Sequence, residues 1–390
     1  MAAWSWRSTS ATGSALTRRP ARTACSVTST AAADGPRTSS CPAGPTPSSL
    51  PSNRAGRSWC QLLDAVRLGP EDDVAEATAA QVRRVVVDLI EMGRWHVGDR
   101  DILVVFDAGY DAPRMARLLA GLPVEVLGRM RSDRVMRRPT PSLKEYALAY
   151  PQGGRPPKHD KEFRFAKPAT WGEPDAATVQ VTDRYGTAQA LAGDRLHPRL
   201  TTRSAWIGHT GELPIIEGTL IRLQVDRLPG GGDPLPLWLW SSATGLTSED
   251  VDVRWQAFLR RFDIEHLFRT MKQTLGWTRP KLRTSGAGDR RTWIVIAAHT
   301  HLRLLRRAAV GLRRPWEKPA DPGRLTPALV RRGFRNLRPH LACPARAPKP
   351  SVPGPGRPPG SKNRRPATRY DVGKTVHRPE SITERNRLGP

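Results

Sequence analysis

The sequence predicts an α/β fold with a β-rich insertion and disordered basic termini. A strand–helix–strand pattern within residues 101–131 indicates a βαβ unit, and β-like segments recur over residues 175–242. The two ends of the chain are too poor in large apolar residues to form a core. The expected parts are a disordered or out-of-frame segment at residues 1–55, a core at 56–345 with a loop and β-rich insertion at 134–243, and a basic Pro/Arg-rich tail at 346–390.

The first elements of the core follow from periodicity and from residues that begin or end helices. Thr78 is a suitable N-cap for an amphipathic helix that Gly93 would end. "DILVVFDAGYD", residues 101–111, reads as a buried central strand that ends in an acid. Asp111 followed by Pro113 predicts the next helix, and "PVEVLGRMR" the second strand.

The remaining elements are expected in chain order. Residues 134–172 are rich in Pro and Lys and read as a loop, whereas "GTLIRLQV" and "LPLWLWSS" read as strands. In the second of these, Trp238 and Trp240 alternate with Leu, as on a packed strand face. "FLRRFDIEHLFRTMKQTLGW", residues 258–277, reads as one helix. Two more are expected, one capped by Asp289 and one begun by Thr326 and Pro327.

Composition limits the classes of partner. The 390 residues include 63 Lys and Arg against 36 Asp and Glu, a formal charge of +27, which favours a polyanion such as nucleic acid. An Arg-rich bias of the whole proteome would also produce this balance. The four cysteines lie far apart without CxxC spacing, and no apolar run is long enough to span a membrane. The N-terminus lacks the apolar region of a signal peptide, so we expect a cytoplasmic, nucleoid-associated protein without a membrane partner.

Two acids are candidates for chemistry. Asp107 ends a predicted buried strand, where α/β sheets place their sites, although a turn-forming Asp would occupy the same position. Glu265 lies on the predicted 258–277 helix, about 40° round from Arg261 and about 20° from Lys272 at roughly 100° per residue. Two such carboxylates suit Mg²⁺, which prefers oxygen ligands, and the two cations suit DNA phosphates. A surface Arg–Glu pair with an unrelated Lys is the alternative interpretation.

The spacing of Phe258, Arg261, Glu265 and Lys272 resembles the Y-(2)-R-(3)-E-(6)-K signature of DDE transposases from bacterial insertion sequences, with Phe258 in place of Tyr. "VVFDAGYD" also resembles the strand that carries the second catalytic Asp of that superfamily. The resemblance implies an RNase H-like core, a mixed sheet flanked by helices. It implies that Asp107 and Glu265 are catalytic metal ligands for Mg²⁺ or Mn²⁺. Arg261 and Lys272 would contact DNA phosphates.

The family pattern needs an earlier Asp on a core strand, and no residue fits it. Asp34 lies in low-complexity sequence, and Asp64 in a context that reads as helix or loop. Read one nucleotide out of phase, the codons for residues 4–15 can encode the strand-like string VVAVDVSNWLR, which contains an Asp near the Ser8–Thr9 junction. We therefore interpret residues 1–55 as an out-of-frame translation of the segment with the first Asp. A genuine disordered DNA-binding arm is the alternative, and a stop codon in the other frame would exclude the first interpretation.

The basic ends suggest contacts with double-stranded DNA. "GRPP" at residues 154–157 and 356–359 resembles the core of an AT-hook, and the tail residues Arg357, Lys362, Arg364 and Arg365 suit phosphates. The leading function is a DNA transposase that cleaves the ends of its element and transfers strands, impaired by loss of the first Asp. A homo-oligomer on DNA is expected with it. A non-catalytic DNA-binding remnant and another RNase H-like nuclease are the alternatives.

Overall fold

A computed structural model describes most of the chain, in two compact units that meet within one helix, between Ile264 and Glu265. Each unit is considered by itself. The described residues are 2–3, 23–29, 60–69, 71–154, 157–203, 206–282, 284–306, 325–337 and 370–371.

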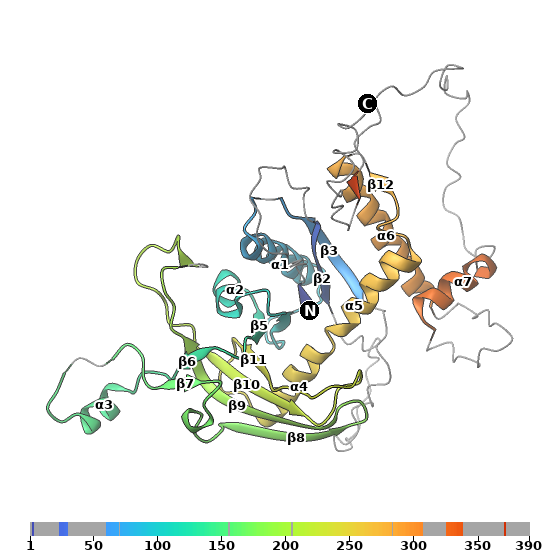
Figure 1. The fold of residues 1–390 in the computed structure, drawn as a ribbon. Coiled ribbons are helices and arrows are strands. Elements are labelled where there is room, and N and C mark those ends of the chain that lie inside the picture. Colours follow the sequence, from blue (N-terminus) through green and yellow to red (C-terminus); the bar gives the residue numbers. More distant parts are fainter. Residues whose placement is uncertain are drawn as a thin grey trace, which may run out of the picture. The chain divides into compact units, whose positions relative to one another are not determined.

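The first unit is built on a mixed sheet whose first five strands have the order β3-β2-β1-β4-β5 (Figure 1). β1 runs parallel to β4, β4 runs parallel to β5, and β2 is antiparallel to β1. This order and these directions are those of an RNase H-like core, as predicted. The strands are β1 (Ala2–Ala3), β2 (Thr23–Ser29), β3 (Gln61–Arg67), β4 (Ile102–Phe106) and β5 (Val124–Met130).

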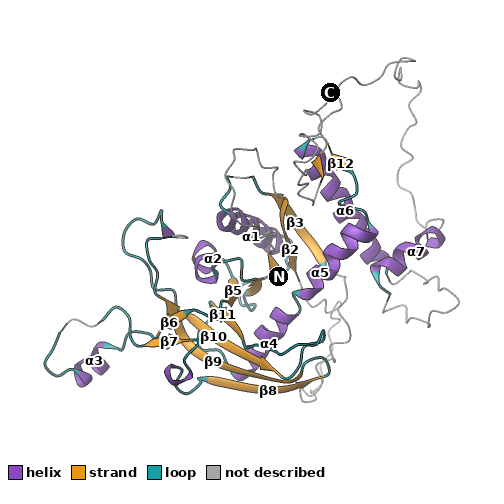
Figure 2. Ribbon diagram, viewed as in Figure 1, coloured by secondary structure: helices purple, strands orange, loops and turns teal. Residues whose placement is uncertain are grey.

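The β-rich insertion continues the same sheet beyond β5 (Figure 2). β11 pairs antiparallel with β5, and β10 and β9 follow, each antiparallel to its neighbour. The strands of the insertion are β6 (Val135–Arg137), β7 (Glu162–Arg164), β8 (Ala176–Thr182), β9 (Gly186–Pro198), β10 (Gly218–Val225) and β11 (Leu237–Ser241). The predicted β-rich region is therefore confirmed. The loop expected over residues 134–172 is not: it contains β6, β7 and the short helix α3 (Leu143–Ala149).

Alternate side chains of the strands pack in two hydrophobic cores, one on each face of the sheet. Val104 and Phe106 of β4 pack with the helices α1 (Val74–Glu91) and α2 (Ala112–Leu118). Val105, between them, packs on the other face with α4 (Ser248–Leu259). This period of two is the ordinary pleat of a strand, and burial on both faces explains the unbroken apolar run of β4.

The predicted strand–helix–strand unit is confirmed, and its tight packing has a local cause. α2 follows β4 and crosses over to the parallel strand β5. Gly128 on β5 faces α2, where an added Cβ would collide with the side chain of Ala112. A glycine at this position therefore lets the first turn of α2 approach the sheet closely.

Three expectations in the first unit need correction. α1 is capped by Asp73, whose carboxylate accepts from the amides of Ala75 and Glu76, and Thr78 is instead buried within the helix, hydrogen-bonded to Tyr110. Asp64 lies on the strand β3 rather than in a helix or loop. The strands β1 and β2 lie within residues 1–55, so the expectation of disorder does not hold at these nine residues.

The described part of the second unit is mainly helical. Its elements are the last part of α5 (Phe262–Arg269), the π-helical η3 (Thr270–Thr274), β12 (Lys281–Leu282), α6 (Ser285–Leu305), α7 (Pro327–Leu337) and β13 (Tyr370–Asp371). Thr284 caps α6, correcting the prediction of Asp289, whereas α7 begins at the expected place. Leu302 of α6 and Val330 of α7 share a small core with Leu325. In the parts of both units that the structure describes, no helix combines the length and apolarity of a membrane span.

Candidate active site at the carboxyl end of β4

Asp107 is the first residue after β4, a strand with a parallel neighbour on each side. The chain turns there: the Tyr110 amide donates a hydrogen bond to the Asp107 carbonyl at 3.1 Å. Asp111 then caps α2 by accepting from the Arg114 amide at 3.0 Å. The helix therefore uses Asp111 as its cap, as predicted, and the side chain of Asp107 is left for another role.

The Asp107 carboxylate lies half-buried with one oxygen unsatisfied. Its side chain is 30% exposed, and the Oδ1 atom is buried without a hydrogen-bond partner among the described residues. Arg261 is the nearest recorded cation, with its Nε atom 3.9 Å from Oδ1, beyond hydrogen-bonding distance. Buried carboxylate oxygens are normally hydrogen-bonded, so this exception marks Asp107 as a place where a ligand would be bound.

Arg261 is held by aromatic rings. Its guanidinium carbon lies 4.2 Å from the ring centroids of both Phe258 and Phe262. The Arg261 side chain is 11% exposed, so this cation–π contact is largely shielded from water. Phe258 is fully buried in the core beneath α4. The aromatic residue at the first position of the signature therefore supports the arginine at the second.

The single helix predicted for residues 258–277 is wrong. α4 ends at Leu259 with Arg260 as its C-cap, α5 begins at Phe262, and the chain then widens into the π-helical η3. Glu265 lies exposed on α5, and Lys272 lies partly buried within η3. The predicted stripe of charges is therefore not one face of a continuous helix. Glu265 and Lys272 also belong to the second unit, so a shared site with Asp107 remains a prediction.

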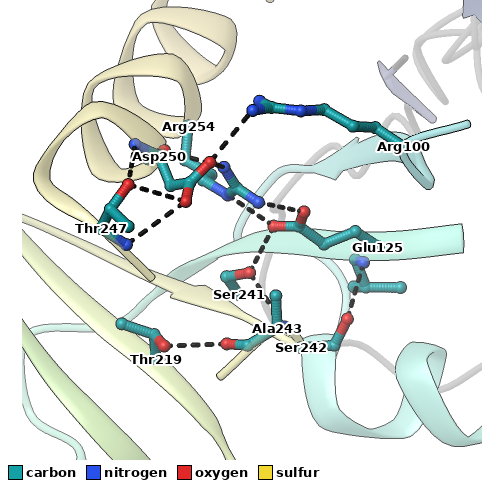
Figure 3. Close-up of polar contacts among 10 residues, drawn as sticks. Arg100, Glu125, Thr219, Ser241, Ser242, Ala243, Thr247, Asp250 and Arg254 are labelled. Carbon is teal, nitrogen blue, oxygen red and sulfur yellow. Dashed lines mark hydrogen bonds and ion pairs between the residues drawn. The ribbon is translucent and has the colours of Figure 1, made fainter. Parts of the chain in front are cut away.

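A second buried carboxylate, Glu125, lies on the neighbouring strand β5 and was not predicted as a site residue. Arg254 of α4 donates two hydrogen bonds to Glu125 of β5, from Nε at 2.8 Å and from Nη2 at 2.6 Å (Figure 3). The Ser241 hydroxyl of β11 donates to the same carboxylate at 2.5 Å. The signal in the sequence was a lone acid within the apolar run "PVEVLG". Glu125, in contrast to Asp107, has partners for both oxygens.

Glu125 and Arg254 belong to a larger polar network. Asp250 accepts from Arg254 at 3.1 Å, lies 3.6 Å from Arg100, and forms a capping box with Thr247 at the start of α4 (Figure 3). The hydrogen bond from the Thr247 hydroxyl, with help from Arg254, lowers the pKa of Asp250 below its ordinary value. The network thus joins the middle of α4 to β5 through Arg254, and its capping box stabilises the first turn of α4.

A comparison with protein families finds a match over part of the chain. Residues 22–199 match the family described as DDE superfamily endonuclease. No curated protein matches the chain. The match to the DDE endonuclease domain contains Asp107 and Glu125, whereas Arg261, Glu265 and Lys272 lie beyond its last residue.

DDE endonucleases use divalent metals, and Asp107 fits such a ligand because its buried Oδ1 lacks a hydrogen bond. Among the residues that the structure describes, no three His, Cys, Asp or Glu side chains form a group that could hold a metal. Asp64 does not complete the DDE set: it pairs with Arg84 at 2.8 Å, and β2 and β1 separate its strand from β4. β1, beside β4, is formed by Ala2 and Ala3 and carries no acid.

Several other predicted sites lie outside the described residues. These are the tail residues Arg357, Lys362, Arg364 and Arg365, the segment with Asp34, and the Arg-Pro centre of the first GRPP sequence at residues 155–156. Trp238 and Trp240 are described and buried, and Trp240 donates to the Leu196 carbonyl at 3.0 Å. The prediction that they form a packed strand face is confirmed.

Proposed function

We propose that the chain is a DNA transposase of the insertion-sequence type, which cleaves element ends and transfers strands. The observation that carries the proposal is Asp107: a half-buried acid with an unsatisfied oxygen, at the carboxyl end of a central strand, in a domain of the DDE endonuclease superfamily. The charge of +27 supports a polyanionic partner, whose binding should weaken steeply with salt. We include in the proposal an oligomer on DNA and a place in the nucleoid.

The roles of the residues follow from their chemistry. Asp107 and Glu265 would hold Mg²⁺ or Mn²⁺, which, when bound, polarises the phosphodiester and activates water or a 3′-hydroxyl. Arg261, stacked between two phenylalanine rings, would bind a DNA phosphate or balance the charge of Asp107. Lys272 would supply a second phosphate contact from η3.

We further propose that activity is impaired because the first acid is missing. β1 has the position of the strand that carries this acid in the family pattern, and its two residues are alanines. An out-of-frame segment would explain the absence. The out-of-frame proposal covers residues 1–55, of which residues 22–55 lie within the family match.

Cleavage of DNA with the element's ends tests the proposal. A frame-restored chain should cleave in Mg²⁺ or Mn²⁺ and should lose cleavage with Asp107→Asn. Asp101→Asn is the matched control, because Asp101 is exposed immediately before β4, whereas Asp107 follows it. Cleavage by neither the present nor the restored chain, with DNA binding intact, would contradict the enzyme and favour the DNA-binding remnant. Hydrolysis without strand transfer would favour another RNase H-like nuclease.

A further inference from the structure

Arg254, in the middle of α4, and Arg261, two residues after its end, face two carboxylates, one on β5 and one directly after β4. Arg254 binds Glu125, and Arg261 lies near Asp107. In the parallel register of β4 and β5, Glu125 is aligned with Leu103, four residues before Asp107. From Arg254 to Arg261 the chain covers roughly 10 Å at the helical rise, the last two residues lying in the turn after α4, and four residues of strand cover roughly 13 Å. The two contacts therefore have similar spacing, in the same order along the helix and along the sheet.

The two contacts differ in strength. The Arg254–Glu125 pair is bidentate, its side chains are 11% and 9% exposed, and Ser241 satisfies a further lone pair of the carboxylate. Arg261 approaches Asp107 only to 3.9 Å. A buried bidentate pair resists displacement more than a longer contact does, because separation would leave two charges unpaired away from water. The first contact therefore helps to hold α4 against β5, together with its apolar core and the hydrogen bonds from Thr178 and Gln180 to Asp252.

We propose that Glu125 and Arg254 are positioning residues that set the distance between the Arg261 guanidinium and Asp107. Their pair fixes α4 against β5. Arg261 is thereby held close enough to balance the charge of Asp107 but too far away to donate a hydrogen bond to the Oδ1 atom of Asp107. The oxygen is thereby kept for a ligand. The value of this arrangement for catalysis rests on the proposed function, whereas the positioning itself does not.

Amide hydrogen exchange at the α4–α5 junction tests the positioning in the full chain. The amides of Arg261, Asp263 and Ile264 are hydrogen-bonded to Phe258, Arg260 and Arg261 at 3.1, 2.9 and 3.0 Å. Arg254→Met should raise their exchange rates at least about tenfold, because the junction loses its anchor. Arg254→Lys, which keeps the charge but loses the bidentate geometry, should have an intermediate effect and serves if the first variant fails to fold.

A double-mutant cycle separates positioning from simple stabilisation. The Arg254–Glu125 pair and Asp107 are far apart, so substitutions at Arg254 and Asp107 should act independently unless a shared element couples them. We expect Asp107→Asn to change exchange at the junction several-fold in the otherwise unchanged chain and hardly at all beside Arg254→Met. An equal effect of Asp107→Asn in both backgrounds would overturn the proposal. Arg137→Met, which breaks the Arg137–Glu162 pair of the insertion at 2.7 Å, is the control and should leave the junction unchanged.

Cleavage kinetics distinguish failure of this inference from failure of the proposed function. In a frame-restored chain, Arg254→Lys should lower kcat at least about fivefold with KM unchanged, because Arg261 is misplaced while DNA contacts remain. A change in KM alone would contradict positioning. Absence of cleavage in all versions would contradict the proposed function, and the exchange cycle would still decide the role of the Arg254–Glu125 pair.

Discussion

Glu125 and Asp107 are buried or half-buried acids on adjacent parallel strands, yet their surroundings are opposite. Glu125 has Arg254 and Ser241 on its two oxygens, whereas the Oδ1 atom of Asp107 has no hydrogen bond among the described residues. A satisfied buried carboxylate holds elements together, and an unsatisfied one holds a place for something that binds. Four residues of strand, roughly 13 Å, thus separate the structural acid from the candidate catalytic acid along the sheet.

The largest expected effect concerns Asp107, the acid with the unsatisfied oxygen. In a frame-restored chain, Asp107→Asn should lower cleavage by roughly 10³-fold or more, since an amide binds a divalent cation poorly. Glu125→Gln should reduce cleavage far less, because Gln can still accept from Ser241 and Arg254. Initial rates with excess DNA would measure both. Equal losses of cleavage rate from Asp107→Asn and Glu125→Gln would contradict the assignment of a catalytic role to Asp107 and a structural role to Glu125.

Loss of the Glu125–Arg254 pair should have a large effect on stability. Glu125→Ala leaves the Arg254 guanidinium buried without its main partner and should lower the free energy of unfolding of the first unit by about 3–5 kcal/mol. Asp107→Ala removes no hydrogen bond to Oδ1 and should cost less than about 1 kcal/mol. Urea unfolding followed by the fluorescence of buried Trp255 and Trp240 would compare them. A greater cost for Asp107→Ala would contradict the comparison.

A smaller effect is expected when the positive charge at position 254 is kept. Arg254→Lys loses the paired hydrogen bonds to Glu125 and should cost about 1.5–3 kcal/mol. Arg195→Lys is a suitable control, because its pair with Glu217 has a 58% exposed arginine and should contribute little. Similar losses of unfolding free energy for Arg254→Lys and Arg195→Lys would show that burial does not make the Arg254–Glu125 pair stronger than an exposed pair.

The smallest effect concerns pH. The pKa of Asp250 in the folded chain lies below its ordinary value of 3.8, chiefly because Thr247 donates a hydrogen bond to it. Its ionised form therefore stabilises the fold above that value, and the stability is lost as the pH falls through the lowered folded pKa. Asp250→Asn should flatten the acid side of the stability–pH profile below about pH 4. An unchanged profile would exclude Asp250 as a contributor.

Local patterns predicted the central part of this fold. β4, α2 and β5 follow from an apolar run, an Asp-Pro helix start and a second apolar run, and all three were expected. The cap of α1 was misassigned because Asp73 and Thr78 both precede apolar periodic residues, and only burial of Thr78 against Tyr110 decides between them.

The site was harder to predict, since tertiary contacts shape it. Nothing in the periodicity of residues 258–277 indicates the break at Arg260, which accompanies the stacking of Arg261 between Phe258 and Phe262. Glu125 was overlooked because a single acid in an apolar strand has no partner visible in the sequence: Arg254 is 129 residues away. Asp107 lies directly after the strand, as predicted, but its unsatisfied oxygen is a property of the folded chain.

Iron-directed cleavage of the protein backbone would test the central claim most directly. Fe²⁺ bound in place of Mg²⁺ generates radicals with peroxide and ascorbate, which cut the chain near the metal. If Asp107 and Glu265 share an ion, fragments should end near both residues, and excess Mg²⁺, Asp107→Asn or Glu265→Gln should suppress both sets of cuts. Cuts near only one of the two acids, or cuts that survive Asp107→Asn, would contradict a shared metal site.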